Sequence, residues 1–188
     1  MEVNEALPEY RRYTYEDYCS WDDDKRWELI DGFPYAMSAP SRKHQEISRN
    51  LFSQLHNSLK GNPCEVYFAP FDVRLNADTY DDTVVQPDIL VVCDRDKLDA
   101  KGCIGAPDLV IEILSPSTML HDKIIKFRRY LRAGIREYWI VDPEGNTVTV
   151  NILKDGEYVA VPYAGDESIP VHVLEGCVID LHEVFYDA

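Results

Sequence analysis

Apolar and polar positions change their period several times along the chain, which predicts a mixture of helices and strands. Residues 42–60 carry apolar side chains at a four-residue spacing, as one face of a core-packed helix would. These side chains are Ile47, Leu51, Leu55 and Leu59. Within residues 107–114, the segment 109–114 instead forms an apolar run interrupted only by Glu112, which is typical of a buried strand.

Shorter signals predict the remaining elements. Thr14 with Asp17 resembles a capping box, and Asp31-Gly32 and Asp155-Gly156 each predict a hairpin. A second helix is expected from about residue 119 to Gly134, with Leu120, Ile124, Phe127 and Leu131 on its apolar face. We expect strands at 65–75, 84–93 (broken by Pro87), 137–141, 147–153 and 157–162, a loop with one turn at 94–105, and a short strand and final turn within 171–185.

This order of elements predicts a mixed α/β (α+β) fold rather than the regular alternation of a doubly wound sheet. The 188 residues suit one domain over 13–188 after a lead-in of residues 1–12. The sequence contains no repeat, no Gly/Ser linker and neither of the glycine-rich phosphate-binding motifs, so a nucleotide cradle is not expected.

Composition indicates a soluble cytoplasmic protein. No apolar run has the length of a membrane span, and the acidic first residues lack the features of a signal peptide. The five cysteines are odd in number and widely spaced, so we expect reduced, mostly buried thiols and neither a disulfide framework nor a zinc site.

The net charge of −15 argues against a nucleic-acid partner, because phosphate binding usually needs a basic surface. The charges are unevenly distributed, however. Residues 123–136 hold six lysines and arginines and no acid. The local charge of a site can therefore differ in sign from that of the whole chain.

Two acids interrupt otherwise apolar segments and are the leading candidates for chemistry. Asp88 precedes an apolar run, and Glu112 lies inside another. A buried carboxylate needs a cation or hydrogen-bond partners, and two of them on adjacent strands can bind Mg²⁺ or Mn²⁺ together with the carbonyl of Ile113. Each acid taken alone is also compatible with a strand end that reaches solvent.

Lysines of the following helix can offset charge at such a site. Lys126 lies on one line of the helix with Asp122 and Tyr130, and Lys123 is its nearest competitor. We expect Lys126 to orient a water or stabilise charge developing on a phosphate, with a solvated helix lysine as the alternative reading.

Several motifs follow one another in a fixed order along the chain. The N-terminal part of the series is Glu28-Leu29-Ile30-Asp31-Gly32 with His44 after Pro40. The series continues with Gln86-Pro87-Asp88, Glu112 to Thr118, Asp122 with Lys126 and Tyr130, and Gly134 to Pro143. This ordered series resembles the Uma-type restriction endonuclease family of the PD-(D/E)xK nuclease superfamily. The resemblance covers about residues 13–185 and implies a central mixed sheet flanked by helices.

The resemblance also implies roles for individual residues. Asp88 and Glu112 would bind the metal, Lys126 would be the catalytic lysine, and Glu28 would be an auxiliary acid. The superfamily places its lysine two residues after the glutamate, where this chain has Leu114, so the lysine function would have moved to the helix.

Other residues are weaker candidates. His44, Lys123 and Gln86 are expected to contact substrate, although a structural histidine at 44 and an exposed strand acid at Glu28 are equally ordinary. We expect Asp72 to be structural and Tyr138 and Trp139 to serve as core or dimer contacts.

The leading hypothesis is therefore Mg²⁺- or Mn²⁺-dependent hydrolysis of DNA by a homodimer. The alternatives are an inactive nuclease-fold binding or assembly protein, which the acidic composition favours, and a metal-dependent hydrolase of another phosphate ester.

Overall fold

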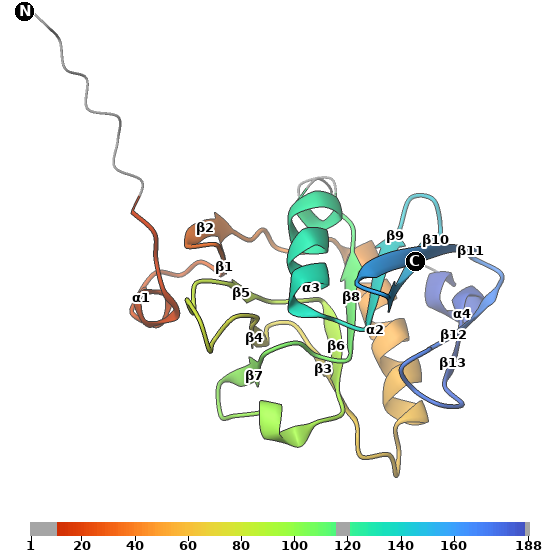
Figure 1. The fold of residues 1–188 in the computed structure, drawn as a ribbon. Coiled ribbons are helices and arrows are strands. Elements are labelled where there is room, and N and C mark those ends of the chain that lie inside the picture. The colour runs from red at the N-terminus through yellow and green to blue at the C-terminus, as the bar shows by residue number, and fades with distance from the viewer. Residues whose placement is uncertain (1–10, 116–120, 187–188) are drawn as a thin grey trace, which may run out of the picture.

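The computed structural model describes residues 11–115 and 121–186, apart from the side chains of 121–123, and is built around a six-stranded mixed sheet (Figure 1). The strand order is β11-β10-β9-β8-β6-β3, and β8 and β9 are its one parallel pair. The strands are β3 (Glu65–Phe68), β6 (Ile89–Val92), β8 (Leu109–Ile113), β9 (Glu137–Asp142), β10 (Thr147–Lys154) and β11 (Glu157–Ala164). The mixed sheet and the Asp155-Gly156 hairpin agree with the expected fold class.

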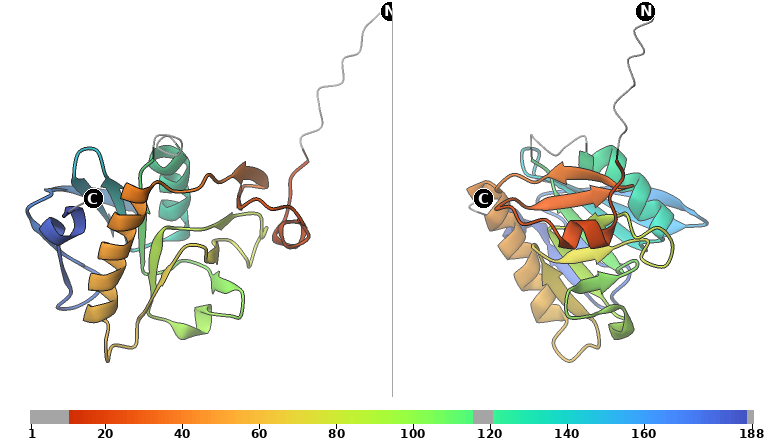
Figure 2. Two further views of the ribbon diagram at one scale, coloured as in Figure 1. Left: turned by 180° about the vertical axis from the view of Figure 1, so that it is seen from behind. Right: turned by 90° about the vertical axis from the view of Figure 1, so that its left-hand side faces the viewer.

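Helices cover both faces of this sheet, which explains why its central strands are apolar on both sides. α2 (Arg42–Ser58) lies on one face, and α3 (Phe127–Ala133) lies on the other (Figure 2). Along β6, Ile89 and Val91 join the core under α2, whereas Leu90 and Val92 join the core on the α3 side. Strands buried on both faces read as continuous hydrophobic runs.

The predicted stripe of α2 is confirmed, since Ile47, Leu51 and Leu55 are fully buried. The first turn begins at Ser41, whose hydroxyl accepts a hydrogen bond from the backbone N–H of His44. Among the described residues, no helix combines the length and apolar character that a bilayer span requires.

A second, five-stranded sheet lies beside the first in the order β2-β1-β5-β4-β7. Its strands are β1 (Trp27–Ile30), β2 (Phe33–Ala36), β4 (Asp72–Arg74), β5 (Val84–Val85) and β7 (Gly102–Ile104). α1 (Tyr15–Cys19) packs on it through Tyr15, which contacts Leu29 and Val84, and the capping box of Thr14 and Asp17 is confirmed.

Two predictions about strands need correction. The stretch 65–75 is not a single strand, because β3 belongs to the first sheet and β4 to the second. The break expected at Pro87 is present, and it separates β5 of the second sheet from β6 of the first. The stretch 94–105 contains the expected turn, as the 3₁₀ turn η1 (Arg95–Lys97), but it also contains strand β7, which was not predicted. β7 exists because it pairs in parallel with β4, and such a long-range pairing leaves no local periodic signal.

The C-terminal segment closes the core over α2. It consists of β12 (Ser168–Pro170), β13 (Val178–Asp180) and α4 (Leu181–Phe185). The Gln54 side chain of α2 is bonded to both backbone groups of Asp180, at 3.0 and 2.8 Å, which fixes this segment to the helix.

The expectation of free thiols throughout is wrong for one pair of cysteines. Cys64 and Cys93 form a disulfide across the ends of β3 and β6. Glu65 pairs with Val92, so the next residue outward on each strand is a cysteine directly opposite the other. Cys103 and Cys177 are buried free thiols as expected, whereas Cys19 is exposed.

Candidate active site

The register of the central sheet brings Asp88 and Glu112 to the same place. Ile89 pairs with Ile111 and Leu90 with Val110, so Asp88 comes opposite Glu112 one step further along. Side-chain alternation directs both acids to the face that α3 covers, because Leu90 and Val110 belong to that core. The backbone N–H of Ile113 donates to Asp88 Oδ2 at 2.8 Å, which holds this carboxylate at the strand end.

Lys126 reaches the acids from the helical side. It ends the π-helical turn η2 (His121–Lys126), and its Nζ lies 2.8 Å from Glu28 Oε1 and 2.9 Å from Glu112 Oε1. The three side chains are only 3–4% exposed. Burying charge at this depth is strongly unfavourable unless opposite charges meet with good geometry, which this arrangement provides.

Tyr130 shares the oxygen that Lys126 contacts. Its hydroxyl donates to Glu112 Oε1 at 2.5 Å. Burial, followed by the charge of Glu112, raises the pKa of Tyr130 well above its ordinary value, so the hydroxyl keeps its proton. Since Lys126 and Tyr130 are four residues apart, one helical line holds Glu112 with two donors.

The predicted apolar face of this helix is only partly right. Ile124 is 49% exposed, whereas Tyr130 is fully buried. The reason is the π-helical turn, whose wider winding changes the angle between successive side chains from that of an α-helix. Leu120 and the predicted start at residue 119 lie outside the described residues, as does the side chain of Lys123.

His44 approaches Asp88 from the opposite direction. Its Nε2 lies 3.2 Å from Asp88 Oδ2, and its ring comes from the first turn of α2. The imidazole is buried, so it orients the carboxylate instead of projecting into solvent. Whether His44 also contacts substrate stays a prediction.

Gln86 and Glu28 are buried residues that link the site to the second sheet. The backbone N–H of Gln86 donates to Glu28 Oε1 at 2.8 Å. The Gln86 side-chain amide donates to the Tyr18 hydroxyl at 3.0 Å and to Asp72 Oδ1 at 2.9 Å, and its carbonyl accepts from Arg26. Gln86 is therefore held by protein groups, and its direct contact with substrate stays a prediction. Asp72 has the structural role that was expected.

Sequence reasoning missed Arg26. Its Nε and Nη2 donate to Gln86 Oε1 at 3.0 and 2.7 Å, and it lines the same cavity as the acids. A signal was present, because Arg26 precedes Glu28 by two residues and two-residue spacing keeps extended side chains on one face.

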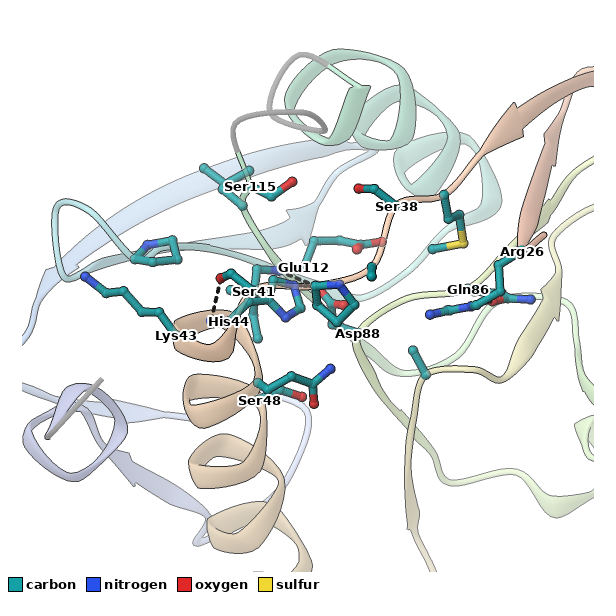
Figure 3. Close-up of a pocket in the computed structure, with 18 of the residues that line it drawn as sticks. Arg26, Ser38, Ser41, Lys43, His44, Ser48, Gln86, Asp88, Glu112 and Ser115 are labelled. Carbon is teal, nitrogen blue, oxygen red and sulfur yellow. Dashed lines mark hydrogen bonds and ion pairs between the residues drawn. The ribbon is translucent and has the colours of Figure 1, made fainter. Parts of the chain in front are cut away.

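These residues surround a cavity of about 510 Å³, a volume within the range of ligand-binding pockets. Figure 3 shows Asp88, Glu112 and His44 near its centre, with Arg26 and Lys43 at opposite ends. Tyr138 and Trp139 are fully buried and do not line it.

The donor set of this cavity suits Mg²⁺. Asp88 and Glu112 offer hard carboxylate oxygens, and the carbonyl of Ile113 points to the same strand edge as its N–H, which already meets Asp88. Within the described part of the chain, no three His, Cys, Asp or Glu side chains are grouped as a metal site. Magnesium does not require three such side chains, since it is usually bound by one or two carboxylates and keeps several waters.

The mixed α+β fold, with a mixed sheet covered by helices on both faces, is that of a nuclease-fold protein. A crystal structure described as a putative nuclease, from Anabaena variabilis, superimposes with a TM-score of 0.75 and 21% identity, covering 92% of this chain and 97% of the other. The chain belongs to the Uma2 family, described as "Putative restriction endonuclease", which matches residues 13–182. An uncharacterized protein of Synechocystis sp. is 30% identical over 161 residues, 82% of each chain.

Proposed function

We propose that this protein hydrolyses phosphodiester bonds of DNA and depends on Mg²⁺ or Mn²⁺. Membership of the Uma2 family and the nuclease fold support a nuclease. The observation that carries the proposal is the contact of Lys126 with Glu112 at 2.9 Å. The position two residues after Glu112, where the superfamily has its lysine, is Leu114 in this chain, and Lys126 supplies a lysine beside the glutamate instead.

Asp88, Glu112 and the carbonyl of Ile113 would hold the cation. When bound, Mg²⁺ supplies positive charge that polarises a phosphate oxygen and makes a water more acidic. His44 and the N–H of Ile113 orient Asp88, and Tyr130 orients Glu112. These contacts leave the two carboxylates little freedom before any substrate arrives.

Lys126 would stabilise the negative charge that develops on the phosphate and orient the attacking water. It would do so from a pre-organised position, since Glu28 and Glu112 already hold its ammonium group. Glu28 acts as an auxiliary acid in this scheme, because its contact helps to hold the ammonium group of Lys126 beside Glu112.

One observation favours a second candidate, a nuclease-fold binding or assembly protein without activity. Glu112 Oε1 accepts hydrogen bonds from both Lys126 and Tyr130, so one of the carboxylate oxygens proposed to hold the cation is already engaged. The net charge of −15 points the same way, since it opposes the approach of DNA. A third candidate, hydrolysis of a small phosphate ester, is compatible with the cavity volume of about 510 Å³.

The test uses supercoiled plasmid, short duplex DNA, RNA and a small phosphodiester, each with Mg²⁺, Mn²⁺ or EDTA. We expect metal-dependent nicking or linearisation of DNA that Asp88→Asn, Glu112→Gln and Lys126→Met each abolish. Asp96→Asn and Lys154→Met, which change exposed residues outside the cavity, should retain it.

Each alternative gives its own result. Cleavage retained in all three cavity variants would reject the assignment of the site. Absence of cleavage, together with no metal-linked rise in melting temperature, would favour the inactive binding protein. Turnover of the small ester alone would favour the third candidate.

A further inference from the structure

We propose that Arg26 and Lys43 bind phosphate groups of one nucleic-acid strand on either side of the acidic centre. This inference rests on the proposed nuclease function and names residues that would bind the nucleic-acid substrate outside the acidic centre. The substrate would be a polymer that spans the cavity, because two separated cations suit successive phosphates better than one small ester.

Arg26 differs from the other half-buried arginines of the molecule. Arg74 is paired with Asp81, and Arg129 is paired with Asp31. Arg26 instead donates to the neutral carbonyl of Gln86, and among the described residues no carboxylate forms an ion pair with it. Its full positive charge therefore remains available at the cavity wall.

The position of Arg26 is enforced by a network behind it. Its acceptor, Gln86 Oε1, is fixed because the other end of that amide is bonded to Tyr18 and Asp72. The Tyr18 hydroxyl also donates to Asp72 Oδ1 at 3.0 Å. A guanidinium held through one edge presents its remaining N–H groups in a fixed direction, which is the geometry that favours phosphate binding.

Lys43 lies at the other end of the cavity, in the first turn of α2. This turn contains no acidic residue, and the N-terminal end of a 17-residue helix adds a partial positive charge. Besides Glu144, Asp142 also lines the cavity, but its Oδ1 accepts the backbone N–H groups of Glu144 and Gly145. Part of its charge is therefore already compensated within its own turn.

The two cations lie on opposite sides of the reactive acids. Figure 3 shows Lys43 at one end and Arg26 beside Gln86 at the other, with Asp88 and Glu112 between them. A strand placed with its scissile phosphate at the acids would thus meet a cation in each direction. In a chain of net charge −15, such local cations are what an approaching polyanion needs.

The experiment measures binding of a fluorescently labelled short duplex by anisotropy, in EDTA so that no cleavage occurs, over a series of salt concentrations. Each phosphate contact contributes about 0.9 to the slope of log K against log[salt]. Arg26→Gln and Lys43→Gln should therefore each reduce the slope by about that amount. Arg26→Lys should keep the slope, because the positive charge remains. It should weaken binding, because an ammonium group cannot donate two parallel hydrogen bonds to a phosphate as a guanidinium does.

Arg95→Gln is the matched control, because Arg95 is exposed, paired with Glu65 and outside the cavity, and its slope should equal that of the wild type. Wild-type slopes in folded Arg26→Gln and Lys43→Gln would overturn the inference, even if cleavage confirmed the nuclease. A lower melting temperature with an unchanged slope would show that Arg26 only supports Gln86, and so would also overturn it. If the wild type shows no salt-dependent binding, the inference is rejected. If the wild type also fails to cleave DNA in the metal-dependent assay, the proposed function is rejected with it.

Discussion

Replacement of Lys126 by methionine tests whether this lysine keeps two carboxylates buried. The substitution leaves a side chain of similar length but removes the charge that contacts Glu28 at 2.8 Å and Glu112 at 2.9 Å. Removing one partner of a buried ion pair costs about 3–5 kcal/mol, because the remaining charge is left uncompensated. Tyr130 and the N–H of Gln86 still donate to the two glutamates, so we expect the lower half of this range.

For a domain of this size, each kcal/mol lowers the melting temperature by about 2–4 °C, so Lys126→Met should melt about 6–16 °C below the wild type. Circular dichroism melts at neutral pH and urea titrations provide the two measurements. Arg42→Met is the matched control, because Arg42 forms an exposed ion pair with Glu46. Exposed ion pairs contribute little to stability, so this variant should melt close to the wild type.

A double variant separates charge compensation from packing. Glu112→Gln combined with Lys126→Met removes one of the two carboxylates that the loss of Lys126 leaves uncompensated. The double variant should therefore lose less stability than the sum of the losses in the two single variants. If Lys126→Met has the same melting temperature as the Arg42→Met control, the reasoning is refuted. The ammonium group would then not be what makes burial of the glutamates possible.

Three further predictions concern stability. Tyr130→Phe removes a buried hydrogen bond to Glu112 and should lower the free energy of unfolding by about 1.5–3 kcal/mol, measured by urea titration. Burial raises the pKa of Glu137, so the folded carboxyl binds its proton more tightly than the unfolded one. The free energy of unfolding should therefore fall as pH rises through the folded pKa, and Glu137→Gln should flatten that slope in melts recorded across pH. Replacing Cys64 and Cys93 by serine opens a loop with a sequence separation of 29 and should cost about 2–4 kcal/mol, whereas a reductant should lower the melting temperature of the wild type but not of this variant.

Local patterns predicted the elements whose stability depends on near neighbours in the chain. The stripe of α2 and the capping box of Thr14 are examples, because the contacts involved lie within one or two helical turns. The two acids were also visible in advance. A carboxylate such as Glu112 inside an apolar strand is costly unless a partner compensates it, so its presence predicts that partner.

Features that depend on pairing between distant segments could not be predicted. β7 is a strand only because β4 lies beside it, and Cys64 meets Cys93 only because of the register between β3 and β6. The two-residue spacing could have placed Arg26 on the same face as Glu28, but it could not show which group Arg26 binds. Its neutral partner, Gln86, is 60 residues away, and the absence of a carboxylate partner is visible only in three dimensions.

The competition between Lys126 and Lys123 also could not be decided from spacing alone, since both lie in a segment that winds as a π-helix. Tyr130 gives a physical reason for Lys126, because the two side chains converge on one oxygen of Glu112. A lysine at position 114 would come from the same strand as the glutamate, whereas here the two charges come from a strand and a helix. The geometry of the site therefore depends on how the helix packs on the sheet, and a variant that loosens this packing should disturb the acids even if it changes none of them.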